Sequence, residues 1–582
     1  MKERLKIGLI VDSEQVSRHV YELAEWANTT DTLWVSHLII QQTPPLPAGL
    51  GGRLARMVRR NPIQHLHSAL WRIKARLESG RVARVKAFGG GQASYDLRGL
   101  VPGEIRVTPL LSKSRFVRRF SDADLATIGQ ERFDVLIRCG SGILKGGILS
   151  SARLGIVSFH HGDNRINRGG PPGFWEVYYK QERTGFVVQR LTEELDGGDV
   201  ILRGYIPTQE THLLNLAMLY GKSFHRLRSL LLEVARTGEL PAAEARYPYS
   251  GTLLVAPKLH ELTAYLLRQV TRSTRGRLRR ALRYQERWGI FFAKSGWRNA
   301  VLWRGARVET PAGRFLADPF VVTRDGRTCV FAEDYEYRTG KGRVSVFELD
   351  GGAARELGVA LDESFHLSFP YLFEYQGTLF MCPESCDARQ IRMYECTAFP
   401  LSWRLRAVAM RDVAAADTMI FPKDGLWWML TNISTSEPHD CGVELYAFWA
   451  TSPLSEAWQP HALNPILNDP LSARNGGLLR DGSELIRVAQ GREFASYGAS
   501  ARLSRIARLT PTEYVEEAVS SLTPDFVHGI HGIHHFHSNG VYSVWDCKQW
   551  QRIRLPPQVR NPVLRQQQWR ARRWLNMGVP RD

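Results

Sequence analysis

The spacing of hydrophobic and polar positions changes twice along the chain, and each spacing predicts a different kind of structure. Between Leu5 and about Leu240, short apolar runs alternate with stretches of helical period. Alternating strands and helices predict a doubly wound parallel α/β sheet. We expect strands at Lys6–Val11, Leu33–Ile40, Asp134–Arg138 and Ile156–His160, and helices at His19–Ala27 and Leu213–Ala235.

The second half of the chain has a different pattern. From Ala256 to Gln285 the sequence is helical and basic, and from Trp297 onward short β-rich runs alternate with turn residues. A weak repeat of roughly fifty residues lies within the range of propeller blades. Five units open at Phe315–Phe320, His366–Tyr371, Asp417–Phe421, Ala473–Gly477 and His531–His535.

These patterns predict a multidomain protein with four parts. We expect an α/β domain with a doubly wound parallel sheet over residues 1–240 and a basic helical connector over 241–296. An all-β five-bladed propeller follows over 297–555, and a basic tail over 556–582.

The net charge of +19 favours an anionic partner. Basic residues concentrate in Arg53–Lys86, which includes Arg59, Arg60, Arg72, Lys74 and Arg76, and in Arg268–Arg287. Each stretch is either a solvated helix face or a surface that docks to a membrane or polyanion. The charge alone does not decide between these interpretations.

The sequence also indicates a compartment. No apolar run approaches the roughly 18 residues of a membrane-spanning helix, and the N-terminus does not resemble a secretory signal. The seven cysteines are scattered, and their spacing matches no zinc site. We expect a cytoplasmic protein with reduced cysteines and no metal, and leave peripheral attachment to a membrane open. The oligomeric state is not predicted.

Three ordered motifs lie within residues 154–204. They are Gly155-Ile-Val-Ser-Phe-His160, Arg168-Gly-Gly170 followed by Gly173-Phe-Trp175, and Thr184-Gly185 followed by Leu195-Asp-Gly-Gly198. Together they resemble the formyltransferase family, which includes methionyl-tRNA, glycinamide-ribonucleotide and sugar-amine N-formyltransferases. The resemblance implies that a formyl group passes from 10-formyltetrahydrofolate to a primary amine.

The resemblance assigns catalytic roles to three residues. His160 would stabilise the developing oxyanion and move protons. Asp196 would raise the pKa of His160 and relay a proton. Ser158 stands where the family has Asn, and its hydroxyl is a shorter donor than an amide.

The same resemblance assigns binding residues. Folate would lie against the main chain of Gly142, Ile143 and Leu144 and of Glu194 and Leu195. The polar loop after His160 would face the amine substrate through His161, Asp163, Asn164, Arg165 and Arg168. Arg165 and Arg168 are candidates for a phosphate or carboxylate.

The C-terminal half carries a second resemblance. Ala317-Asp-Pro-Phe320, His366-Leu-Ser-Phe-Pro370, Met381-Cys-Pro-Glu-Ser385 and Arg474-Asn-Gly-Gly477 resemble five-bladed propellers of glycoside hydrolases and of glucosamine inositolphosphorylceramide transferases. This similarity implies a central funnel lined by Asp318, His366, Glu384, Asp417, Arg474 and His531.

Together the resemblances predict a folate-dependent N-formyltransferase that acts on an amino sugar or glycan precursor held by the propeller. The substrate is a small molecule, a glycan or a lipid-linked glycan near an anionic membrane; nucleic acid is not the expected partner. Two alternatives remain open. In one, the propeller is a glycoside hydrolase or phosphorylase that uses Asp318, Glu384 or Asp417. In the other, the protein binds glycans without catalysis.

Overall fold

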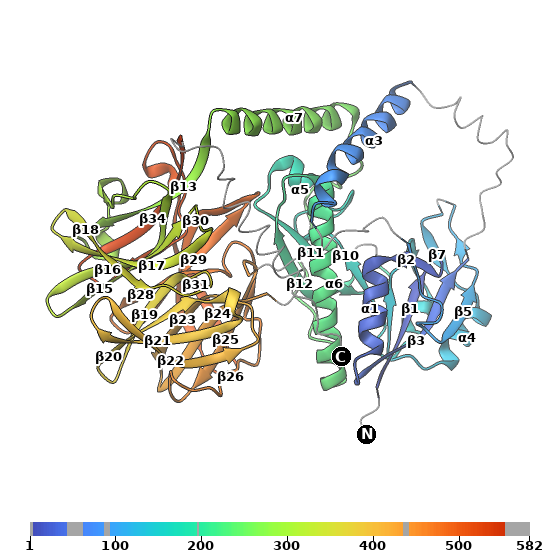
Figure 1. The fold of residues 1–582 in the computed structure, drawn as a ribbon. Coiled ribbons are helices and arrows are strands. Elements are labelled where there is room, and N and C mark those ends of the chain that lie inside the picture. The colour runs from blue at the N-terminus through green and yellow to red at the C-terminus, as the bar shows by residue number, and fades with distance from the viewer. Residues whose placement is uncertain are drawn as a thin grey trace. The chain divides into compact units, whose positions relative to one another are not determined.

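The computed structural model describes residues 4–42, 62–85, 94–113, 115–194, 197–434 and 441–552. The chain divides into two compact units, Met1–Val270 and Thr271–Asp582 (Figure 1). The predicted tail after residue 555, the basic residues Arg53, Arg59 and Arg60, and the predicted site residues Leu195 and Asp196 lie outside the described residues.

The N-terminal unit is built around a seven-stranded sheet (Figure 1). Its strands, in spatial order, are β12 (Asp199–Pro207), β11 (Arg183–Arg190), β10 (Ile156–His160), β8 (Val135–Arg138), β1 (Leu5–Val11), β3 (Leu33–Gln41) and β5 (Gly103–Val107). The five strands from β10 to β5 run parallel. The last two are antiparallel, because β11 pairs with β10 and β12 returns along β11. The predicted parallel sheet is therefore present, with an antiparallel extension at one edge.

Helices cover both faces of this sheet. Helix α1 (Arg18–Asn28) and helix α6 (His212–Thr237) contribute Leu23 and Leu227 to the core on one face. Helix α4 (Asp122–Gln130) contributes Ile128 to the other face, where Phe133 and Leu136 are buried. Burial on both faces explains why residues 7–11 of β1 and 135–137 of β8 are continuously apolar rather than alternating.

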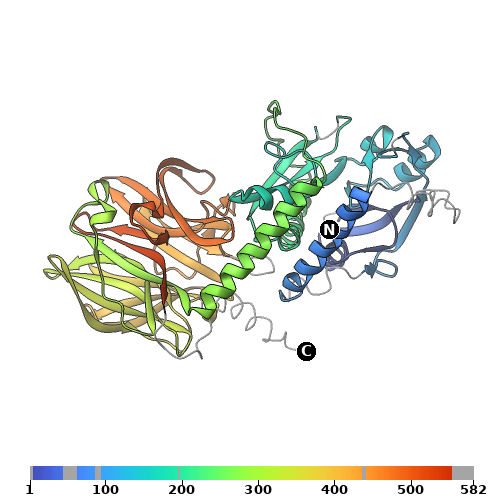
Figure 2. The ribbon, with the colours of Figure 1, turned by 90° about the horizontal axis from the view of Figure 1, so that it is seen from above.

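The remaining elements of the first unit are shorter or lie outside the sheet. Two small sheets pair β2 with β4 and β6 with β7 and β9. Their bounds are β2 (Gln15–Ser17), β4 (Ser94–Asp96), β6 (Leu110–Leu111), β7 (Val117–Arg119) and β9 (Ile143–Leu144). Helices α3 (Pro62–Val82) and α5 (Phe174–Tyr179) complete the unit, with the 3-10 turn η2 (Gly147–Ser150). Helix α7 (Leu259–Ala281), a single continuous helix in Figure 2, falls on the predicted connector.

Among the described residues, the C-terminal unit contains five antiparallel sheets, each named here by one strand. The β13 sheet holds β14 (Ala306–Arg307), β13 (Tyr284–Ala293), β34 (Ser543–Arg552), β32 (Ile530–Gly532) and β33 (Phe536–Ser538). The β15 sheet holds β15 (Arg314–Arg324), β16 (Arg327–Glu336), β17 (Lys341–Asp350) and β18 (Ala353–Leu361). The β19 sheet holds β19 (Ser368–Tyr375), β20 (Thr378–Glu384), β21 (Gln390–Ala398) and β22 (Ser402–Arg411).

The last two sheets follow the same plan. The β23 sheet holds β23 (Ala415–Lys423), β24 (Leu426–Ile433), β25 (Glu444–Ala450), β26 (Gln459–Pro460) and β27 (Leu467–Asn468). The β28 sheet holds β28 (Asn475–Asp481), β29 (Glu484–Glu493), β30 (Ser496–Leu509) and β31 (Tyr514–Leu522). The first four predicted repeats begin at β15, β19, β23 and β28, and the fifth begins at β32.

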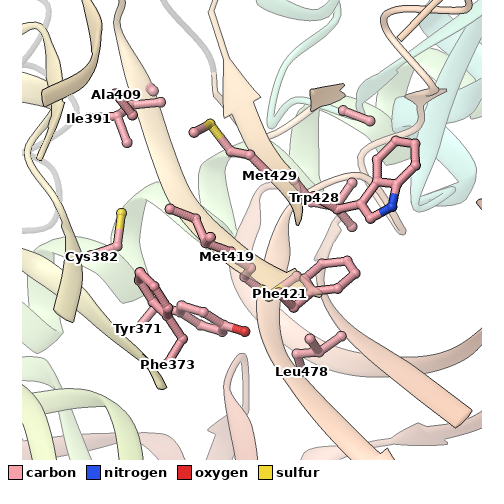
Figure 3. Close-up of a cluster of buried hydrophobic side chains, with 14 of the residues drawn as sticks. Tyr371, Phe373, Cys382, Ile391, Ala409, Met419, Phe421, Trp428, Met429 and Leu478 are labelled. Carbon is pink, nitrogen blue, oxygen red and sulfur yellow. The ribbon is translucent and has the colours of Figure 1, made fainter. Parts of the chain in front are cut away.

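The core of the C-terminal unit forms where neighbouring sheets pack on one another. In Figure 3 the β19 sheet supplies Tyr371 and Phe373, and the β23 sheet supplies Met419 and Trp428. Trp428 and Met429 are almost completely buried. Facing layers of aromatic and sulfur-containing side chains explain the high aromatic content of this half of the sequence.

The chain ends of the C-terminal unit meet in one sheet. Strand β13, at its beginning, pairs along its whole length with β34, from Tyr284 opposite Arg552 to Ala293 opposite Ser543. The first strands of successive sheets also contact one another, β15 with β19, β19 with β23, and β23 with β28. Strand β15 in turn contacts both β13 and β34.

Candidate functional site

The same irregularity recurs in the first strand of four sheets of the C-terminal unit. The register shifts between Ala317 and Phe320 in β15, and at corresponding places in β19, β23 and β28. Asp318, Phe369 and Asp417 lie at three of these bulges with φ values of 50°, 45° and 48°. Bulges re-aim a side chain, and non-glycine residues with positive φ are concentrated at functional sites. Two of the three re-aimed residues are carboxylates.

Asp417 belongs to a buried cluster with Arg474. Arg474 Nε donates to Asp417 Oδ2 at 2.5 Å, and a terminal nitrogen of Arg474 lies 3.7 Å from Glu384 Oε2. Gln490 also donates to Asp417 Oδ2, at 3.0 Å. Glu384 ends β20, so three different sheets contribute charged groups to the cluster.

Asp318 lies beside a second group of buried side chains. His534 Nε2 lies 3.5 Å and His535 Nδ1 3.9 Å from Asp318 Oδ1. Both distances are too long for a good hydrogen bond, and Asp318 Oδ1 accepts none from the described residues. Asp546 closes the group: its Oδ2 lies 2.7 Å from His534 Nδ1 and accepts a hydrogen bond from the Asp318 main chain.

The electrostatics of the two carboxylates are unusual. Burial raises the pKa of Asp318 to about 7, against the opposing effect of His534. Burial likewise raises the pKa of Asp417 to about 7, with Arg474 opposing and Glu384 adding to the shift. Burial alone would also raise the pKa of Asp546, but His534 outweighs it and lowers that pKa. The carboxyl group of Asp318 and that of Asp417 can therefore each gain or lose a proton near neutral pH.

Asp318, His534 and Asp546 could also hold a metal ion. One donor atom from each lies within 4.8 Å of the others. The close approach of His534 Nδ1 to Asp546 Oδ2, at 2.7 Å, instead pairs these two side chains with each other. The geometry alone assigns no metal.

A cavity of about 500 Å³ in the same unit is lined by Glu493, Phe494, Ser496, Ala499, Pro524, Asp525, Ile530 and His531. Its residue Ser496 is followed by Tyr497, whose ring lies 5.1 Å from the Arg474 guanidinium. Tyr497 therefore connects the wall of the cavity to the carboxylate cluster.

The predicted funnel residues are not all placed together. Glu384, Asp417 and Arg474 lie in one buried cluster, and Asp318 lies in the neighbouring group, close enough for Asp417 and Arg474 to influence its pKa. His366 instead accepts a hydrogen bond from Gly342 N at 2.8 Å and lies 3.5 Å from Glu333. His531, also expected in the funnel, pairs with Glu286 at 3.0 Å and stacks on Trp550, and His534 is the histidine that lies 3.5 Å from Asp318.

In the N-terminal unit, Ser158 and His160 lie at the end of β10 as expected. Ser158 is buried and its Oγ accepts a hydrogen bond from Arg138 at 3.2 Å. His160 Nε2 lies 3.1 Å from the carbonyl oxygen of Asn167. Both side chains thus have structural partners, and the predicted partner Asp196 is outside the described residues.

The main chain expected to bind folate already has partners. Ile143 N donates to Phe116 O at 2.7 Å, and Leu144 is part of the β7–β9 pairing. Arg138 donates to Gly142 O, and a Cβ on Gly142 would meet Arg118 Nε at 2.4 Å. Glu194 pairs with Arg246 at 2.8 Å. The Ile143 amide and the Gly142 carbonyl, which were expected to contact folate, thus already have hydrogen-bond partners within the fold.

The loop after His160 divides between packing and an open surface. His161 stacks on Tyr220 and Phe159, and burial lowers its pKa to about 3. Asp163 pairs with Arg203 and accepts a hydrogen bond from Tyr205 at 2.9 Å. Asn164, Arg165 and Arg168 instead line a cavity.

The second half of the chain is similar in sequence to known proteins. Residues 300–535 match the family model described as glucosamine inositolphosphorylceramide transferase 1, N-terminal. The rice protein of that name (Oryza sativa subsp. japonica) is 37% identical over 212 residues, and the Arabidopsis thaliana protein is 38% identical over 211. The matched region covers 35% of this chain but only 28% and 27% of these relatives.

The predicted formyltransferase activity is wrong. The matched family model and the rice and Arabidopsis relatives carry the name glucosamine inositolphosphorylceramide transferase 1, and none of them is named as a formyltransferase. A methionyl-tRNA formyltransferase from Ehrlichia canis (strain Jake) is 30% identical, but over only 114 residues, which cover 19% of this chain and 37% of that protein. The predictions of 10-formyltetrahydrofolate as a cofactor and of one-carbon transfer are therefore wrong as well.

Solved structures resemble the C-terminal half at low similarity. The catalytic domain of a GH62 α-L-arabinofuranosidase from Coprinopsis cinerea is 14% identical, with a TM-score of 0.32, covering 46% of this chain and 97% of that domain. A family 117 glycoside hydrolase from Zobellia galactanivorans is 10% identical, with a TM-score of 0.30, covering 45% of this chain and 90% of that one.

Sequence reasoning missed several residues of the site. His534 belongs to the His531–His535 string, where the choice among three histidines was open. Asp546 carried a signal that was overlooked, since an acidic residue interrupts the otherwise apolar start of β34. Tyr497 and Gln490 carried no signal, because polar residues in short strands are common.

Proposed function

We propose that the C-terminal unit binds a glycosyl group at the cluster of Asp318, Glu384, Asp417 and Arg474. The observation that carries this proposal is the repeated bulge, which aims Asp318 and Asp417 out of their strands. Carboxylates and an arginine present acceptors and donors for sugar hydroxyls, and the cavity beside Tyr497 offers the ring of Phe494 to a sugar. The relatives' name, which includes glucosamine and inositol phosphate, supports a sugar of this kind.

The same proposal includes the architecture. The five sheets between residues 284 and 552 form a closed five-bladed propeller, in which β34 completes the ring by pairing with β13. The contacts between successive first strands and the length of the β13–β34 pairing support this closure. In a closed ring the four bulges surround one axis, and the cluster becomes the floor of a central site.

Titration of the full chain with the glucosamine–inositol phosphate headgroup tests the binding site. Asp417→Asn keeps the side-chain size and tolerates the positive φ, so we expect weaker binding without loss of fold. Asp424→Asn is the matched control, because Asp424 also has a positive φ, of 51°, but lies exposed in the turn after β23. Equal binding by both variants would refute the site.

A second candidate function is glycosyl transfer or hydrolysis at this cluster. The observation that favours it is the pair of buried carboxyls with pKa values of about 7. Glycoside chemistry uses one carboxylic acid that is protonated near neutral pH and one carboxylate. Cleavage of a 4-nitrophenyl glycoside panel by wild type, and none by Asp318→Asn or Asp417→Asn, would support catalysis. Binding of the headgroup without cleavage of any glycoside would support the binding function and exclude catalysis.

We also propose an anionic membrane surface as a partner of the N-terminal unit. In helix α3, Ile63, Leu66, Ile73 and Leu77 are 50–61% exposed and lie on one helical face. Arg72 and Arg76 are exposed on the same helix, and neither pairs with a carboxylate among the described residues. Exposed apolar side chains flanked by arginines suit the boundary between lipid headgroups and acyl chains.

Vesicle sedimentation tests this surface. We expect the full chain to bind phosphatidylserine-containing vesicles more tightly than pure phosphatidylcholine, and to dissociate as salt rises. Leu66→Gln with Ile73→Gln should weaken binding, whereas Leu463→Gln, which changes an exposed leucine of the C-terminal unit, should not. Unchanged binding of the α3 variant would exclude this face. None of the described helices is long and apolar enough to cross a bilayer.

A further inference from the structure

A cavity of about 360 Å³ in the N-terminal unit has a composition that neither the fold nor the carbohydrate site explains. It is lined by Asn164, Arg165, Arg168, Arg203, Ala245, Tyr247, Pro248 and Tyr249. Its volume lies within the range of small-molecule sites. Three guanidinium groups and two tyrosine rings in one cavity are a combination suited to an anion that carries a flat group.

The cationic groups of the cavity are not fully neutralised. Arg203 is bound by Asp163 and Glu244. Burial alone would lower the pKa of Arg203, but Glu244 and Asp163 outweigh it and raise that pKa. Arg165 shares Glu244, at 2.9 Å. Two carboxylates therefore face three arginines, and one positive charge is left over.

The surplus charge belongs to Arg168. Its Nε donates to the carbonyl oxygen of Asn164 at 2.9 Å, and its guanidinium lies 4.6 Å from the centre of the Tyr249 ring. Its two terminal nitrogens have no acceptor among the described residues. A guanidinium oriented by Nε, with both terminal nitrogens available, matches the bidentate geometry by which arginine binds phosphate.

The cavity wall is held in place by hydrogen bonds and close packing. Arg168 N donates to the Tyr249 hydroxyl at 3.3 Å, and that hydroxyl donates to Thr252 O at 3.2 Å. Further along the segment, Gly170 N donates to Leu254 O at 3.0 Å. The tyrosines are thus presented by a segment with fixed contacts, and the site exists before a ligand binds.

We propose that this cavity binds a phosphate ester, with the phosphate on Arg168 and Arg165 and a flat face of the ligand on Tyr247 and Tyr249. The flat face is the base of a nucleoside or the apolar face of a sugar. This proposal concerns the N-terminal unit alone and does not rest on the carbohydrate site of the C-terminal unit.

Calorimetric titration of the full chain with uridine diphosphate, glucose 1-phosphate and inorganic phosphate tests the proposal. We expect at least one ester to bind more tightly than inorganic phosphate. Tight binding of uridine diphosphate alone would identify a nucleoside, and equal binding of both esters would identify the sugar or phosphate end as sufficient. Failure of both esters, or equal affinity for inorganic phosphate, would overturn the proposal.

Two pairs of variants locate the site. Arg168→Ala should weaken ester binding at least about tenfold, as expected when a charged hydrogen-bonding pair is lost. Arg246→Ala is its control. Arg246 stands between the lining residues Ala245 and Tyr247 in the sequence, but its side chain pairs with Glu194 and Asp199, which do not line the cavity. Tyr247→Ala should reduce the preference for the ester over inorganic phosphate, whereas Tyr179→Ala, an exposed tyrosine elsewhere in the unit, should not. Binding that Arg168→Ala leaves unchanged would refute the assignment.

Discussion

Arg474 donates a 2.5 Å hydrogen bond to Asp417, although the two residues belong to successive sheets. Asp417 lies at the bulge of β23, and Arg474 directly precedes β28. Asp417 is almost completely buried and Arg474 largely so. Glu384 approaches the same guanidinium from a third sheet, at 3.7 Å. Arg474 therefore neutralises two carboxylates that water does not solvate.

Replacing Arg474 with Met should destabilise the protein strongly. Removing one partner of a buried ion pair leaves an uncompensated charge and typically costs about 3–5 kcal/mol. The loss should be smaller at pH 5 than at pH 8, because Asp417 becomes protonated below its raised pKa. Urea unfolding followed by tryptophan fluorescence measures the difference, with exposed Arg411→Met as a control that we expect to stay within about 0.5 kcal/mol. Equal losses for the two variants would contradict the assigned contact.

The contribution of Asp318 and Asp417 to the stability of the wild type should fall as pH rises from about 4 to about 7. The folded-state pKa values of Asp318 and Asp417 lie near 7, above the ordinary value of 3.8. In this window each of these two carboxyls binds its proton more tightly in the folded protein than in the unfolded chain, so each lowers the free energy of unfolding by up to about 1.4 kcal/mol per pH unit. Above pH 7 this contribution levels off.

Asp318→Asn isolates the contribution of one group. Between pH 4 and 7 we expect the free energy of unfolding of wild type, relative to this variant, to fall by up to about 1.4 kcal/mol per pH unit. Asp325→Asn, at an exposed turn position that also has a positive φ, should retain the wild-type slope. The measurement is the free energy of unfolding in urea at pH intervals. An unchanged slope in Asp318→Asn would show that Asp318 does not titrate there.

Lys74 shows how tertiary packing overrides a local charge pattern. The sequence placed it in a basic stretch that was either solvated or available for docking. In the structure Lys74 is buried, and its Nζ donates to Glu78 at 3.1 Å and to His212 Nδ1 at 2.8 Å. Burial lowers the pKa of His212 to about 3, so the ring is neutral and accepts through Nδ1. The neighbouring Arg72 and Arg76 remain exposed, as the pattern allowed.

Lys74→Met should therefore cost much more stability than Arg76→Met. The first variant leaves Glu78 buried without its cation, for which about 3–5 kcal/mol is expected. The second changes an exposed side chain and should stay within about 0.5 kcal/mol. Thermal and urea unfolding of both variants provide the comparison. Similar stabilities would mean that Lys74 is solvated.

Gly169 fixes one wall of the arginine-lined cavity by close approach. A Cβ at this position would come within 1.9 Å of Leu254 O, a backbone atom that cannot rotate away. Gly169→Ala should cost about 1–3 kcal/mol and displace the segment that carries Tyr249. Gly129→Ala meets nothing within 4 Å and lies in α4, so it should be neutral or stabilising. Wild-type stability and ester binding in Gly169→Ala would show that this approach is not needed.

Local patterns predicted four strands and two helices of the N-terminal unit, and all six are present. The run Lys6–Val11 became β1, and Leu213–Ala235 became the body of α6, because both segments bury the faces that their periodicity marks. The antiparallel strands β11 and β12 were not predicted as such. Alternation of strands and helices carries no information about strand direction once two strands follow each other without a helix.

The candidate site was predictable only in part. Asp318 and Asp417 were predicted because their motifs resemble those of glycoside hydrolase propellers. The pairing of His534 with Asp546, and their place beside Asp318, depend on β34 meeting β13 across more than two hundred residues of chain. No short motif encodes such a contact. The formyltransferase motifs show that a short motif can also mislead. They resemble that family locally, whereas the relatives of the chain point to a different function.

The most direct test of the account is a crystal structure of the full chain with the glucosamine–inositol phosphate headgroup. The account predicts that the sugar contacts Asp318 or Asp417, with Arg474 still bound to Asp417, and that crystals of Asp417→Asn prepared in the same way lack it. A sugar bound elsewhere, with the carboxylate cluster unoccupied in wild-type crystals, would contradict the proposed site.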